Sequence, residues 1–575
     1  METAQPLSIV QPAEGSRPLG GVQRAYFYLV ALVGVHMVVL AIANLLRVAI
    51  EIAFHAPPGG FTGLPFIFAD LNQPNEVYRQ QASLAVALLV VGLPVWLIHF
   101  GYAQRIARQR PEDRASAWRS FHLHLVIFVT ALLVFGYGQR ALRLVLQGIF
   151  LGGSSLPSYF GIESEWGARA AGAAAMVIAA AAALAYHVRI SSGDRRATLV
   201  AGRAASLRQL VLYSLALIGL FGAAIAAIST LGPIWDYVTQ RVVPVRGIDL
   251  TPNSADMLKF QLLETVPALL AGVSLWLATW IPLQRGVRAS TADAEVERRS
   301  GLRALAIYLV VLVSAVAVLA GTVFVLASVG RRLLGDPIVE QFSSLQREIG
   351  TPLVTVIVFG VIWIFYRRVV SAEAAREARL ERAANIRRVY TYLIAAIGLA
   401  MIAIGAAGTL GVLGSMGMGI NTHSHGETAT YIALLLVGAP AWGFAWFQVV
   451  RGLSDDERRS LPRRTYLYLV IGGSVIALLV FVSAILYRLL NATLAGSFGL
   501  GLWHDVWHLT VDAGVSAGPF LFHLGALRGD RRAQVTAAPE PTEHSVTVLV
   551  RAIDAATARA RVASALGSQT DITVR

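Results

Sequence analysis

Histidine and acidic residues with the spacing of metal ligands gather near the C-terminal end of the chain. The segment NTHSHGET contains His423, His425 and Glu427, and the segment WHDVWHLTVDAG contains His504 and His508. On a helix, the last two residues lie about one turn apart, and two imidazoles at that spacing can share a zinc ion. We therefore expect a divalent-metal site in which His504 and His508 bind the ion and His423, His425 or Glu427 supplies a third ligand. The alternative is that these side chains are simply solvated or hydrogen-bonded near the headgroups.

Two further ionisable residues are candidates for function. Asp512 follows His508 by one helical turn and would orient that imidazole. His36 stands midway along an apolar run, and ionisable groups inside such runs mark functional positions by default. His36 could act as a proton relay, or it could be neutral and hydrogen-bonded to a neighbouring helix.

The chain lacks the common signatures of catalysis. It contains no cysteine, no phosphate-binding glycine-rich loop with lysine, no Gly-x-Ser-x-Gly and no His-Glu-x-x-His. We therefore assign no catalytic or cofactor-binding residue, and the only cofactor that the sequence suggests is the divalent metal.

The elements that position these residues are membrane helices. Of the 575 residues, 56% are hydrophobic and only 14% are charged, and the mean hydropathy is +0.61. A bilayer core requires about 20 apolar residues per helix. Twelve runs meet this length, near residues 24–48, 82–103, 120–146, 168–188, 208–231, 260–283, 303–330, 352–369, 388–413, 430–450, 464–490 and 506–527. The predicted fold is an all-α integral membrane bundle of about twelve transmembrane helices.

The positive charge of the chain indicates its orientation. The formal net charge is +14, which in a soluble protein would suggest a nucleic-acid partner. Here the five connections after the even-numbered spans hold 27 arginines, whereas the six after the odd-numbered spans hold 10 basic residues. Short loops rich in basic residues stay in the cytoplasm. We expect a multi-pass protein of the plasma (inner) membrane with both termini cytoplasmic and no nucleic-acid partner.

A repeated motif begins several odd-numbered spans. Tyr26 and Tyr28 follow Arg24, and the same Arg, Tyr-x-Tyr, Leu pattern recurs at Tyr390 with Tyr392 and at Tyr466 with Tyr468. Weaker copies at His124, Tyr213 and Tyr308 complete a spacing of about 90 residues, which predicts six helical hairpins of parallel topology. Two residues apart on a helix is about 200°, so one tyrosine of each pair can face lipid and the other the bundle.

The even-numbered spans carry a second motif. Gly92-x-Pro94-x-Trp96 recurs as Gly438-x-Pro440-x-Trp442, and a weaker copy without proline begins at Gly272. A proline within a span kinks its helix, and a glycine two residues earlier lets a neighbouring helix approach closely. We expect kinks at Pro94 and Pro440, which serve either as packing inherited by duplication or as hinges.

These two motifs in tandem resemble an uncharacterised bacterial membrane-protein family, a domain of unknown function that is common in Chloroflexi-type bacteria. The resemblance covers roughly residues 20–530, and the second repeat, with His122 and His124, departs from it most. It implies membrane location and repeated hairpins, and it supplies neither a reaction nor catalytic residues.

The composition changes after Gly529. The sequence predicts a strand at HSVTVLV, a helix at AATARARVASALG and a second strand at TDITVR. Such a unit is too small to be stable alone. The predicted domains are a disordered cytoplasmic lead at 1–23, the bundle at 24–528, a linker at 529–543 and a β-α-β tail at 544–575. We expect the tail to dock on the membrane domain, to pair with a second copy of the chain or to bind a protein partner.

Three classes of function remain open. The first is a non-catalytic membrane scaffold that organises lipid or partner proteins. The second is a transporter or channel for a small solute, which should show a polar path between the helices. The third is a metal-binding membrane enzyme. The few charges within the spans favour the scaffold, or a facilitator of apolar solutes, over an ion-coupled pump.

Overall fold

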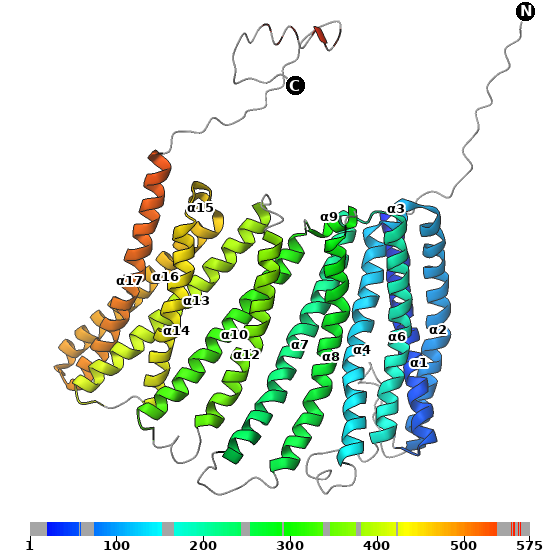
Figure 1. The fold of residues 1–575 in the computed structure, drawn as a ribbon, viewed down its shortest axis with the longest axis horizontal. Coiled ribbons are helices and arrows are strands. Elements are labelled where there is room, and N and C mark those ends of the chain that lie inside the picture. The colour runs from blue at the N-terminus through cyan, green and yellow to red at the C-terminus, as the bar shows by residue number, and fades with distance from the viewer. Residues whose placement is uncertain are drawn as a thin grey trace, which may run out of the picture. The chain divides into compact units, whose positions relative to one another are not determined.

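The computed structural model describes residues 20–56, 58, 74–151, 166–242, 254–289, 292–298, 300–336, 345–374, 381–420 and 424–536, with scattered positions between 554 and 564. The chain divides into two units, Met1–Leu521 and Phe522–Arg575. Within the described part of the first unit, the long helices lie side by side (Figure 1).

The long helices are α1 Gly21–Ala53, α2 Pro74–Gln109, α4 Ala117–Leu151, α6 Trp166–Ala197, α7 Gly202–Val242, α8 Ser254–Arg288, α10 Gly301–Leu333, α12 Leu345–Ala374, α13 Glu381–Gly417, α14 His425–Arg451, α16 Leu461–Ala495 and α17 Leu500–Thr536. Three short helices, α3 Pro111–Arg114, α9 Ala292–Arg298 and α15 Asp455–Arg459, join them at one edge of the first unit (Figure 1).

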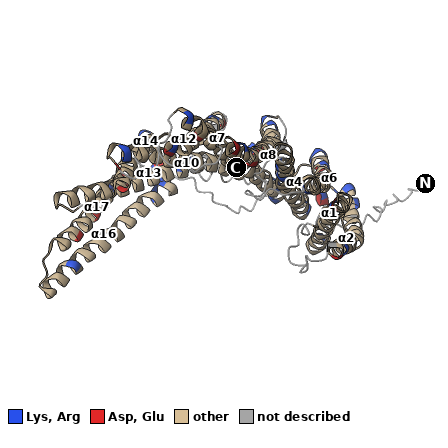
Figure 2. Ribbon diagram, turned by 90° about the horizontal axis from the view of Figure 1, so that it is seen from below, with Lys and Arg blue, Asp and Glu red and all other residues tan. Residues whose placement is uncertain are grey.

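The structure confirms an all-α, multi-pass membrane protein. Among the described residues, eleven helices are long and apolar enough to cross a membrane. The twelfth expected span corresponds to α17, which is long enough but is not one of those eleven. Charged residues occur as separate patches along an otherwise uncharged ribbon (Figure 2). No strand occurs in the described part of the chain, and the predicted strands of the tail lie outside it. Helix α17 continues to Thr536, into the region predicted as a linker.

Five of the six predicted hairpins form in the described part of the chain, whereas α16 and α17 make no extensive contact with each other. The hairpins are α1 with α2, α4 with α6, α7 with α8, α10 with α12, and α13 with α14. Neighbouring hairpins then contact in series, because α1 packs on α6, α4 on α7 and α8, α7 on α12, and α10 on α14. Helix α16 packs on α13, and none of the residues in its most apolar stretch is buried.

Glycines set how closely the two helices of a hairpin approach. A Cβ atom on Gly219 of α7 would lie 2.5 Å from the backbone nitrogen of Trp276 and 3.0 Å from the carbonyl oxygen of Gly272, both on α8. The same reciprocal packing joins Gly34 to Gly92 and Gly398 to Gly438. The glycine of each Gly-x-Pro-x-Trp motif, and of its proline-free copy, therefore permits backbone-to-backbone contact.

The prolines of the motif lie inside uninterrupted helices. Helix α2 contains Pro94 and helix α14 contains Pro440, and both helices continue on either side of the proline. The kinks at these positions stay predictions.

Candidate functional site

A buried arginine ties together the four long helices α1, α2, α4 and α6, which we call the first module. Arg119 of α4 is 1% exposed and donates to the Asp194 carboxylate of α6, with Nε 2.7 Å from Oδ2. It also donates to the hydroxyl of Tyr28 on α1 at 3.3 Å and to the Gln104 side chain on α2. One guanidinium therefore connects all four helices. We call this arrangement an arginine clamp.

The second module, α7, α8, α10 and α12, contains an equivalent clamp. Arg303 of α10 is 2% exposed and donates to the hydroxyl of Tyr213 on α7 at 3.0 Å. It also donates to Gln284 of α8 at 3.3 Å and to the Glu373 carboxylate of α12. Charge-assisted hydrogen bonds of this kind satisfy a charge that burial would otherwise destabilise.

The third module begins with α13, α14 and α16 and repeats the central contact. Arg463 of α16 is 2% exposed and lies 3.4 Å from the hydroxyl of Tyr392 on α13. The tyrosine hydroxyl also donates to Glu457 at 2.8 Å.

An acidic residue on each short helix pairs with a second arginine, on the helix that carries the clamp tyrosine. Asp113 of α3 pairs with Arg24 at 2.6 Å, Glu297 of α9 with Arg208 at 3.1 Å, and Glu457 of α15 with Arg388 at 2.5 Å. Each acid precedes its clamp arginine by six residues, at 113 and 119, 297 and 303, and 457 and 463. This spacing was visible in the sequence. The positive-inside rule alone accounts for the arginines of these connections by membrane orientation and does not predict this contact.

The clamps explain the tyrosine motif and reveal a larger repeat. Tyr28 is 2% exposed inside the first clamp while Tyr26 is 55% exposed, so one ring faces inward and the other outward. Because one hairpin supplies the tyrosine and the next supplies the arginine, the structural repeat is a pair of hairpins. The first four hairpins therefore combine into the first two modules, and α13, α14 and α16 repeat the same contact in the third.

The predicted metal ligands of the last helix converge on a serine. His504 and His508 have ring centroids 4.7 Å apart, and each Nε2 lies 3.0 Å from the hydroxyl oxygen of Ser415 on α13. Nδ1 of His504 is 3.9 Å from the Asp505 carboxylate. Both imidazole nitrogens thus lie within hydrogen-bond distance of the Ser415 hydroxyl near the ends of α13 and α17.

The other predicted ligands are placed differently or fall outside the description. Glu427 caps α14 by accepting from the backbone nitrogen of Ser424 at 3.0 Å, and exposed His425 begins the same helix. His423 lies outside the described residues. In the part of the chain that the structure describes, no group of three or more His, Cys, Asp or Glu side chains could hold a metal ion. The metal site stays a prediction.

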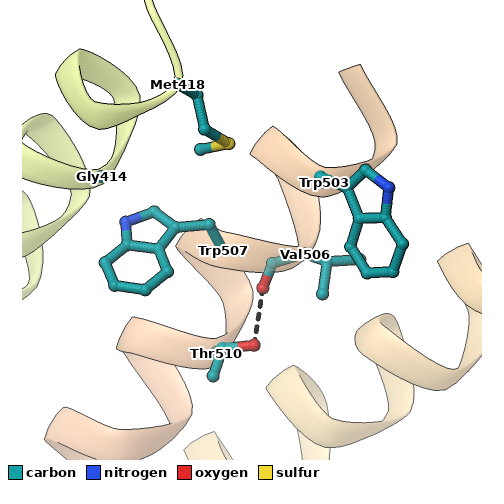
Figure 3. Close-up of a pocket in the computed structure, with 6 residues that line it drawn as sticks. All are labelled: Gly414, Met418, Trp503, Val506, Trp507 and Thr510. Atoms are coloured by element: carbon teal, nitrogen blue, oxygen red, sulfur yellow. Dashed lines mark hydrogen bonds between the residues drawn. The ribbon is translucent and has the colours of Figure 1, made fainter. Parts of the chain in front are cut away.

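Beside the two histidines lies an aromatic pocket of about 390 Å³. Trp503, Val506, Trp507 and Thr510 of α17 line it together with Gly414 and Met418 at the end of α13 (Figure 3). Trp507 points toward α13, where its indole nitrogen donates to the Leu410 carbonyl at 3.1 Å (Figure 3). The lining is almost wholly apolar, which suits a hydrocarbon or aromatic group.

The two intramembrane candidates have different surroundings. Nδ1 of His36 lies 2.7 Å from the carbonyl oxygen of Leu32 in its own helix, and its Nε2 is buried without a partner. Asp512 is in α17, one turn beyond His508, and its backbone carbonyl accepts from the Ser516 hydroxyl at 2.7 Å. Neither residue touches a clamp in the hydrogen bonds described.

The family comparison agrees with this modular architecture. A domain of unknown function, DUF5671, matches residues 24–158, 244–361 and 388–517. The chain belongs to this family. Each of the three DUF5671 matches covers helices of one module. The search of curated proteins and the search of solved structures gave no match.

Proposed function

We propose that this DUF5671 chain is a non-catalytic membrane scaffold. The carrying observation is that its modules are joined in series, while an arginine clamp closes each of the first two modules and the third repeats the arginine–tyrosine contact. Among the described helices, no extensive contact joins the first module to the third. A series of this kind leaves apolar faces available to lipid and to partner proteins.

In the proposed scaffold, the edge of the first unit that carries α3, α9 and α15 lies in the cytoplasm. Helices α3, α9 and α15 lie at one edge of the first unit (Figure 1), within arginine-rich connections. The positive-inside rule assigns such connections to the cytoplasm. Both termini would then be cytoplasmic, which gives the 544–575 tail access to soluble partners.

The described pockets between helices fit lipid better than a polar solute. A pocket of about 240 Å³ between α10, α12, α13 and α14 is lined mainly by apolar side chains such as Leu319, Ile394 and Phe444. A second, of about 380 Å³, lies between α4, α6 and α8 and is lined by residues such as Leu142, Leu184 and Leu270. A solute path would require polar groups along its length. These pockets therefore favour the scaffold over the transporter.

Two measurements on the full chain test the scaffold. Proteoliposomes should be no more permeable to a panel of small polar solutes than vesicles that hold an inert membrane protein. In native membranes, cross-linked neighbours recovered with the full chain should be lost when the chain ends at Thr536, with the melting temperature unchanged. Specific solute flux would favour the transporter, and identical neighbours for both chains would remove the proposed role of the tail.

A second candidate function rests on the outer histidines. Nε2 of His504 and Nε2 of His508 each lie 3.0 Å from the Ser415 hydroxyl oxygen, so two nitrogens and one oxygen are close together. Zinc accepts such ligands and retains water in an open catalytic site. A metal-dependent activity would require His504→Ala/His508→Ala to lower the zinc content of the purified protein. Equal zinc content in the variant and the wild type would contradict a metal-dependent activity at these histidines.

A further inference from the structure

The interior of the first module contains four buried polar atoms without a hydrogen-bond partner. They are Nε2 of His36, His122 and His187 and Nε1 of Trp96, one from each of the helices α1, α4, α6 and α2. The side chains of His122 and His187 are 0% exposed. An unsatisfied buried polar group costs about 1–3 kcal/mol. Four unsatisfied polar groups in one interior indicate a ligand-binding site.

The hydrogen bonds of the histidines fix which nitrogen is available. Nδ1 of His122 lies 2.9 Å from the carbonyl oxygen of Tyr28, and Nδ1 of His187 lies 2.7 Å from that of Ala183. A carbonyl only accepts, so in the neutral rings Nδ1 carries the proton and Nε2 carries the lone pair. Histidines that bind metals are held in this way, with the other ring nitrogen donating to a backbone carbonyl or a carboxylate.

The spacing of the two rings matches a shared ion. The ring centroids of His122 and His187 are 5.8 Å apart. Metal–imidazole bonds are about 2 Å long, so two rings that bind one ion from opposite sides have centroids about 6 Å apart. In the described residues no third His, Cys, Asp or Glu joins this pair in a metal-binding group, so the pair suits an ion that is stable with two protein ligands. Zinc takes four ligands, whereas imidazole also suits copper. Monovalent copper, a closed-shell ion, forms linear complexes with two ligands.

The surroundings of the pair suit a soft cation. The ring of Phe100 lies 5.0 Å from that of His122 and 5.6 Å from that of His187, and Tyr186 lies 5.2 Å from His187. Aromatic faces stabilise a desolvated cation. Arg119, three residues before His122 on the same helix, is paired with Asp194.

The second module has no histidine pair at the equivalent positions. Counted from the clamp residues, Ala306 takes the place of His122, Tyr366 that of His187, and Trp276 that of Trp96. There the indole nitrogen of Trp276 donates to the Tyr366 hydroxyl at 3.1 Å, so that the tryptophan is satisfied. The first module therefore replaces a satisfied Trp–Tyr pair by unsatisfied histidines.

We propose that the first module binds one Cu(I) ion between the Nε2 atoms of His122 and His187. This inference is independent of the scaffold function and of the outer histidines. His36, whose Nε2 is also buried and unpartnered, lies on α1 of the same module and belongs to its polar interior.

The test uses the full chain in nanodiscs under anaerobic conditions, with Cu(I) titrated against a chromophoric chelator. We expect one Cu(I) per chain, and an X-ray absorption edge typical of two nitrogen ligands. His187→Tyr installs the residue of the second module, which can accept from Trp96 and so preserve the fold. It should weaken Cu(I) binding by about 100-fold or more, since even the loss of an outer-shell partner costs 10–100-fold. His122→Ala, again the residue of the second module, should do the same.

The matched control is His99→Gln. His99 lies on α2 of the same module, but its Nε2 is 3.2 Å from the Tyr26 hydroxyl, so this variant should bind Cu(I) as the wild type does. The proposal is overturned if the wild type binds no Cu(I), or if both His187→Tyr and His122→Ala retain it. It is also overturned if Cu(I) binding is lost in His504→Ala/His508→Ala, because the ion would then be at the outer histidines.

Discussion

Removing a clamp arginine should destabilise its module far more than removing an exposed one. Arg303 is the strongest case, because its guanidinium contacts Tyr213, Gln284 and Glu373 from three other helices. In Arg303→Met the apolar part of the side chain is kept beside the ring of Trp280, over which the guanidinium carbon lies at 5.9 Å. The substitution therefore removes charge and hydrogen bonds with little loss of volume.

The size of the destabilisation depends on the Glu373 carboxylate, which Arg303→Met leaves without its partner. Breaking a buried ion pair by removing one partner costs about 3–5 kcal/mol, because the other charge stays buried. The Glu373 side chain is 23% exposed and so retains part of its hydration. We therefore expect a loss near the lower limit, about 3 kcal/mol, which is roughly a 100-fold change in the folding equilibrium. Tyr213→Phe should cost less, about 1–2 kcal/mol, since it removes only the hydroxyl.

Steric trapping in nanodiscs measures the unfolding free energy of each variant. Arg79→Met is the control, because Arg79 pairs with Glu76 on the surface with its side chain 76% exposed. Its loss should stay below about 0.5 kcal/mol. The double variant Arg303→Met/Glu373→Gln should recover part of the stability that Arg303→Met loses, since it removes the orphaned carboxylate. The reasoning is refuted if Arg303→Met behaves like the control, or if the double variant recovers nothing.

Three further predictions test the architecture. Reporter fusions after Gly419 and after Thr536 should report outside and inside, respectively, and the opposite signals would invert the proposed topology. Gly219→Ala should destabilise the protein by about 1–3 kcal/mol through overpacking. The control Gly360→Ala should not destabilise the protein, because no atom lies within 4 Å of the added Cβ. Equal melting temperatures for the two variants would contradict the close approach at Gly219. Pro440→Ala should straighten α14 without unfolding the protein, so spin-label distances along the helix should lengthen, and unchanged distances would show that this proline causes no kink.

Local patterns were sufficient to predict five of the six hairpins. Long apolar runs fix the spans, and short connections bring consecutive spans together as antiparallel neighbours. The glycine of Gly-x-Pro-x-Trp predicted a close approach, and Gly92 and Gly438 do pack against the backbone of the adjacent helix. These inferences succeed because each depends on residues within a single hairpin.

The clamps were missed because they join residues far apart in sequence. Arg119 meets Tyr28 across 91 positions, and Arg303 meets Tyr213 across 90. An arginine in a connection rich in basic residues is explained by membrane orientation alone, so nothing local indicated that some arginines turn inward. The evidence available in the sequence was the repeated acid six residues before each clamp arginine. That spacing becomes informative only when the three modules are aligned with one another.

Duplication also explains why one module departs from the others. A clamp, a glycine contact and a tryptophan recur in the modules, and these recurring features are sufficient to close a four-helix unit. Because the clamp of each module uses its own residues, the interior of one copy can change without loosening its neighbours. The second module satisfies Trp276 with Tyr366, which shows that the position needs no histidine for packing. The histidines of the first module are therefore not required by the architecture, and a ligand is the physical reason that best accounts for their unpaired nitrogens.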